Sequence, residues 1–64
     1  MFNDDELTSI INCIEFKRAG YKCDSPAYRQ YKNGLYRLIN SPELLTYEEA
    51  GLIARIYEFE NLRP

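Results

Sequence analysis

The signals that begin helices divide this chain into three segments and leave little room for another fold. Asn3 and Thr46 are each followed three residues later by a glutamate. This spacing matches a capping box, in which the first side chain and the glutamate satisfy backbone donors at a helix start. Ser25-Pro26 marks another start, because proline at the first helical position needs no backbone donor. The sequence therefore predicts three helix N-termini.

Helix ends are also readable. Lys17-Arg18 precedes Gly20, which supplies basic residues for the last turn and a glycine that can adopt the left-handed conformation of a helix stop. Asn40-Ser41-Pro42-Glu43 breaks the second helix and opens a short helical turn over 42–45. The predicted helices span about 4–19, 26–39 and 47–60.

Each predicted helix carries apolar residues at spacings of three and four, which places them on one face. Gly34 interrupts the middle helix and predicts a close contact with a neighbouring helix. No hairpin signal joins two strand-like runs. The expected fold is therefore all-α, a compact three-helix bundle forming a single domain over 1–64. Its predicted core consists of Ile10, Ile14, Leu35, Leu38, Ile53 and Tyr57.

The absence of histidine and the presence of only two cysteines argue against a metal site, and no cofactor motif is found. Cys13 and Cys23 could form a disulfide. The acidic first residues do not resemble a secretory signal, which favours reduced thiols and a cytoplasmic location. No apolar run approaches the roughly 18 residues of a membrane span.

Charge is distributed unevenly along the chain. Four tyrosines directly precede a basic residue between positions 21 and 37, and the segment 17–37 holds six basic residues against one acid. The flanking segments are acidic, so the formal net charge is only −2. A basic, aromatic middle between acidic ends predicts contact with an anionic partner or with the chain's own carboxylates.

The outward side of the middle helix is predicted to carry a small cationic patch. It consists of Arg29, Lys32, Tyr36 and Arg37. Such a patch could stack bases and neutralise phosphates, pair with glutamates of a neighbouring helix, or stay solvated. The sequence pI near 5.0 lies far from that of a typical nucleic-acid-binding domain, which makes nucleic-acid binding the second hypothesis.

The third helix has a second apolar stripe besides its predicted core face. Leu52, Ile56 and Phe59 step by four and three, and Cys13 and Phe16 occupy the matching flank of the first helix. One interpretation is that this stripe completes the core. The other is that these five residues form an interface with a second copy of the chain or with a different protein.

Catalysis is not predicted, because neither cysteine has a neighbouring side chain able to act as a base. In size and composition, the chain is similar to the small accessory proteins that bacteriophages and mobile elements encode to bind and inhibit host proteins. This resemblance implies a non-enzymatic, intracellular protein-interaction module that occupies the surface of a partner.

Overall fold

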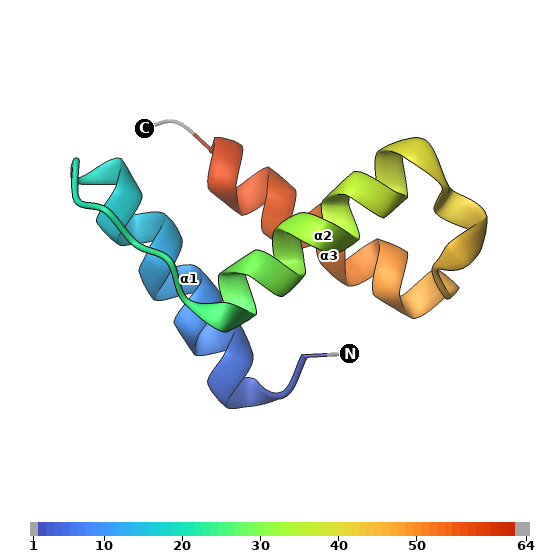
Figure 1. The fold of residues 1–64 in the computed structure, drawn as a ribbon, viewed down its shortest axis with the longest axis horizontal. Coiled ribbons are helices and arrows are strands. Elements are labelled where there is room, and N and C mark those ends of the chain that lie inside the picture. Colours follow the sequence, from blue (N-terminus) through green and yellow to red (C-terminus); the bar gives the residue numbers. More distant parts are fainter. Residues whose placement is uncertain (1, 63–64) are drawn as a thin grey trace. The chain divides into compact units, whose positions relative to one another are not determined.

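A computed structural model describes residues 2–62 of the chain. Its elements are, in order, α1 (Asp4–Arg18), α2 (Pro26–Asn40), the 3-10 helix η1 (Pro42–Leu44) and α3 (Tyr47–Asn61) (Figure 1). No strand occurs between residues 2 and 62. The predicted all-α class with three helices is confirmed, and each helix boundary lies within one residue of its predicted position.

Both predicted capping boxes are present. The Asn3 backbone N–H donates to Glu6 Oε1 at 2.9 Å, and the Glu6 N–H donates to Asn3 Oδ1 at 2.8 Å. At α3, the Thr46 N–H donates to Glu49 Oε1 at 3.0 Å, and this bond, followed by that of the Thr46 hydroxyl, lowers the pKa of Glu49. These reciprocal bonds fix both helix starts through local contacts alone.

The end of α1 is a Schellman motif centred on Gly20, whose φ is +93°. The Gly20 N–H donates to the Lys17 carbonyl at 3.1 Å, and the Tyr21 N–H donates to the Phe16 carbonyl at 2.9 Å. Only glycine adopts this backbone conformation at no steric cost. The chain therefore leaves α1 in a sharp turn, as the sequence predicts.

The chain forms two compact units that divide within α2, one ending at Tyr31 and the other beginning at Lys32. In the N-terminal unit the predicted core residues Ile10 and Ile14 are buried. Tyr28 and Tyr31 of α2 are buried as well. The other buried residues of this unit are Cys13 and Ala27.

In the C-terminal unit the buried face of α3 is turned relative to the sequence prediction. Ile53 is buried as expected, but Ile56 is also buried, with only 6% of its surface exposed. Tyr57, which was assigned to the core, is 46% exposed, and this assignment is wrong. The inner face is centred between Ile53 and Ile56, so that Tyr57 lies at its edge and its hydroxyl can reach water. Leu35 and Leu38 are half-buried.

The predicted close approach at Gly34 is confirmed inside the same unit. A Cβ atom placed on Gly34 would lie 2.6 Å from Cδ1 of Ile53. This distance is shorter than carbon atoms can approach, and Ile53 is buried, so it has little space to move. A larger residue at position 34 would therefore force the Ile53 side chain away from its observed position.

We expect Gly34→Leu to destabilise the protein by about 1–3 kcal/mol, because the added side chain overpacks the site occupied by Ile53. Gly51 provides a matched control, since a Cβ atom there would meet nothing within 4 Å. Gly51→Ala should stabilise α3 by roughly 0.5–1 kcal/mol through helix propensity. Urea unfolding monitored by circular dichroism measures both changes. A Gly34→Leu variant as stable as the wild type would contradict the packing described above.

Candidate interaction surface

The residues of the predicted apolar interface differ in burial. Ile56 and Cys13 are buried, so the expectation that they lie on the surface is wrong. Leu52 and Phe59 are half-buried on α3. Phe16 is 54% exposed and is the one member of the set that stands clearly on the surface. The second stripe of α3 thus contributes its central residue to the core, as the alternative interpretation expected.

The predicted cationic patch is also divided. Arg29 Nε lies 3.1 Å from Asp24 Oδ1, and Lys32 Nζ lies 3.0 Å from Glu60 Oε1. Tyr36 and Arg37 are exposed. Two of the three cations of the patch are therefore paired with the chain's own carboxylates. The Lys32–Glu60 pair is of the kind that the sequence interpretation proposed, whereas Arg29 pairs with a loop aspartate that it did not include.

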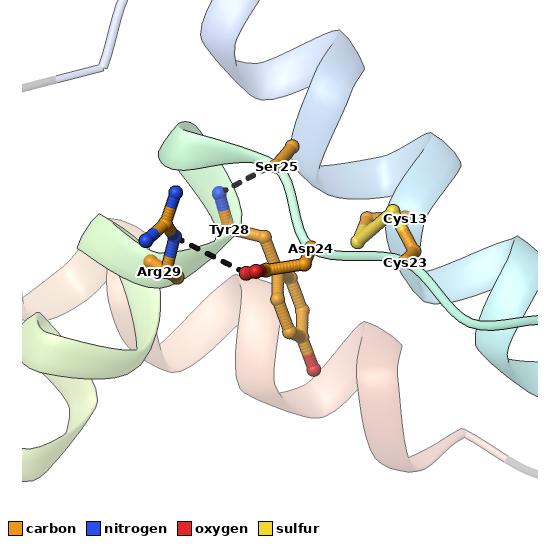
Figure 2. The surroundings of a disulfide bond; sticks show 6 residues. All are labelled: Cys13, Cys23, Asp24, Ser25, Tyr28 and Arg29. Carbon is orange, nitrogen blue, oxygen red and sulfur yellow. Dashed lines mark hydrogen bonds and ion pairs between the residues drawn. A yellow bond between two sulfur atoms is a disulfide. The ribbon is translucent and has the colours of Figure 1, made fainter.

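Cys13 of α1 and Cys23 of the α1–α2 loop form a disulfide, with their Cα atoms 5.4 Å apart (Figure 2). The expectation of two reduced thiols is wrong. The turn at Gly20 reverses the chain, so that the loop runs back beside α1 and brings the two cysteines within the usual Cα separation of a disulfide. The spacing of ten residues around a helix-stopping glycine was the signal that could have indicated this bond.

Beside the disulfide, Phe16 and Tyr21 form an exposed aromatic pair. Their ring centroids are 6.4 Å apart and their planes are nearly perpendicular. The contact is the apolar contact that accompanies a Schellman motif, which explains why these two residues meet. Tyr21 is nevertheless 67% exposed. The Phe16–Tyr21 contact at the end of α1 therefore leaves most of the surface of Tyr21 exposed to solvent.

The loop next to this pair borders a shallow, open hollow of about 510 Å³. We call it the loop hollow. It is lined by Lys17, Gly20, Tyr21, Lys22, Cys23 and Asp24. Lys17 Nζ lies 5.1 Å from the centre of the Tyr28 ring, a cation–π distance that positions this ammonium group. The hollow thus combines an aromatic wall with two lysines.

Charge at the loop hollow is predominantly positive. Its single carboxylate, Asp24, is engaged by Arg29, as Figure 2 shows. The arrangement suits a ligand that carries a carboxylate next to an apolar group. Between residues 2 and 62 there is no cluster of three or more metal-ligating side chains. The hollow offers positioned charge and aromatic surface for binding.

Other large apolar side chains are exposed elsewhere. In the C-terminal unit they are Tyr36, Ile39, Leu44, Tyr47, Tyr57 and Leu62. None of the helices in the described part of the chain is long and apolar enough to cross a membrane. Comparison of the chain with known protein families, curated proteins and solved structures finds no match.

Proposed function

We propose that this chain is a non-enzymatic protein-interaction module whose loop hollow binds an acidic, partly apolar segment of another protein. The observation that carries the proposal is the exposed Phe16–Tyr21 pair, which is held next to Lys17 and Lys22. Tyrosine is among the residue types that dominate binding energy in protein interfaces. Tyr21 and both lysines line the hollow, and Phe16 adjoins it through its ring contact with Tyr21.

The energetic argument depends on the exposed aromatic surface. Fully burying an aromatic side chain contributes roughly 1.5–3 kcal/mol, and Phe16 and Tyr21 are both more than half exposed. The lysines add charge complementarity, which raises the association rate and discriminates against basic partners. The proposed surface is small, so the complex should be one of moderate affinity that depends on salt.

The concrete form of the proposal is an accessory protein that inhibits a host protein by occupying its surface. This form follows the similarity in size and composition to phage and mobile-element proteins. It places the protein in the cytoplasm, where thiols are kept reduced by thiol-based reductants. The disulfide is compatible with that location only as a reversible bond.

Capture from a nuclease-treated bacterial lysate tests the function. The immobilised wild-type protein should retain a specific protein, and the double variant Tyr21→Ser/Lys22→Glu should lose it. Tyr47→Ser is the matched control, since Tyr47 is almost fully exposed in the other unit. Equal capture by all three proteins would exclude the loop hollow as the binding surface.

Two companion experiments distinguish the alternative partners. Retention from an untreated lysate that is absent from the nuclease-treated lysate would indicate nucleic-acid binding, with affinity falling steeply as salt rises. Light scattering of the pure protein detects a homodimer, the alternative partner for an exposed apolar surface. A dimer abolished by Tyr21→Ser/Lys22→Glu would assign the hollow to self-association.

A further inference from the structure

The loop between α1 and α2 depends on very few bonds. Within the described residues, Lys22–Asp24 is tied to the rest of the N-terminal unit by the disulfide and by the ion pair between Asp24 and Arg29. Both side chains of that ion pair are more than 60% exposed, and exposed pairs contribute little to stability. The disulfide is therefore the main constraint that holds this wall of the loop hollow beside α1.

The two cysteines of the disulfide differ in their exposure to solvent. Cys13 has no exposed surface, whereas Cys23 is half-buried and lines the hollow. A thiolate can approach a disulfide only at an accessible sulfur, which directs attack to Cys23. The same open space that would receive a partner thus gives a reductant access to the bond.

We propose that the Cys13–Cys23 disulfide is a reversible redox switch that controls the shape of the loop hollow. The reductant is a dithiol protein of the thioredoxin class. Its thiolate attacks Cys23 Sγ, the Cys13–Cys23 bond breaks, and Cys13 leaves as a thiolate that takes up a proton. The second thiol then resolves the mixed disulfide and releases Cys23. The dithiol is oxidised by two electrons, and both cysteines are reduced. The bond re-forms by the reverse exchange with glutathione disulfide, which accepts the two electrons and leaves as two glutathione thiols.

Reduction changes the binding surface through the loop. Without the bond, Lys22 and Cys23 are no longer held against α1, and Tyr21 retains only its backbone bond to Phe16 and the ring contact. The oxidised protein therefore presents the assembled hollow, and the reduced protein presents a mobile loop. This control of binding rests on the function proposed above, but the switch itself can be tested without any partner.

Trypsin cleavage after Lys22 reports the state of the loop. We expect reduction by thioredoxin to raise the cleavage rate at Lys22 about tenfold or more, while cleavage at Arg55 of α3 changes by less than about twofold. The variant Cys13→Ser/Cys23→Ser should behave like the reduced protein with or without thioredoxin. Unchanged cleavage at Lys22 would overturn the proposal. A parallel rise at both sites would also overturn it, because the bond would then support the fold as a whole.

Reversibility and partner binding complete the test. In glutathione buffers of graded composition, the bond should form and break without hysteresis, and a bond that thioredoxin cannot reduce would overturn the switch. Captured partner should be released on reduction. If Tyr21→Ser/Lys22→Glu still captures the partner while cleavage at Lys22 of the wild-type protein responds to reduction, the proposed binding surface fails and the redox switch stands.

Discussion

Ile56→Asp is expected to unfold the C-terminal unit. Ile56 is buried, and an aspartate there would place a carboxylate in an apolar site without a partner. An uncompensated buried charge costs roughly 3–5 kcal/mol, which is comparable with the total stability of about 3–10 kcal/mol expected for a chain of this length. Circular dichroism at 222 nm should show a large loss of helix at 25 °C, or a thermal transition shifted far below that of the wild type.

Tyr57→Asp is the matched control, because it introduces the same charge one residue further along α3 at a position that is 46% exposed. We expect this variant to stay folded with a modest loss of stability. The comparison separates burial from helix propensity, since both variants carry aspartate in the same part of α3. A folded Ile56→Asp variant with altered association would restore the interface interpretation of the second apolar stripe.

The helices could be predicted from the sequence because their ends are determined locally. The capping boxes at Asn3 and Thr46, the proline after Ser25 and the glycine stop after α1 each involve residues within a few positions of one another. Such contacts do not depend on the rest of the fold. The close approach at Gly34 was predictable for a related reason, because glycine in the middle of a helix needs a packing explanation.

The buried face of α3 could be predicted only in part. Ile53 lies three residues before Ile56 and four before Tyr57, and both spacings place residues on the same side of a helix. Periodicity alone therefore does not decide whether Tyr57 or Ile56 lies inward. The outcome depends on how the helix is rotated against its neighbours, which is a property of tertiary packing. Tyrosine also tolerates an edge position that isoleucine does not, because its hydroxyl can remain hydrated.

The loop hollow could not be predicted from sequence, although each of its parts was visible there. Tyr21-Lys22 belonged to the basic, aromatic segment, and a bond between Cys13 and Cys23 was considered, although reduced thiols were preferred. Their combination in one site depends on the reversal of the chain at Gly20 and on the disulfide that fixes it. The predicted cationic patch on α2 is divided, because Arg29 forms an ion pair with Asp24 and Lys32 forms one with Glu60.

Ile14→Ala is expected to produce the second large effect, in the N-terminal unit. Ile14 is only 2% exposed, and truncation of a buried isoleucine to alanine costs about 2–5 kcal/mol through lost apolar burial and the cavity that remains. In a domain of this size, each kcal/mol shifts Tm by roughly 4–8 °C. The variant should therefore melt at least about 8 °C below the wild type, measured by circular dichroism under oxidising conditions that keep the disulfide intact.

Ile11→Ala removes the same atoms from the same helix at a position that is 39% exposed. Because part of the Ile11 side chain already contacts water, its truncation loses less buried surface and leaves no closed cavity. Alanine also has a higher helix propensity than isoleucine, which partly offsets the loss. The difference between the two variants therefore measures burial at position 14. If Ile11→Ala lowered Tm as much as Ile14→Ala, the inner face of α1 would have to be assigned differently.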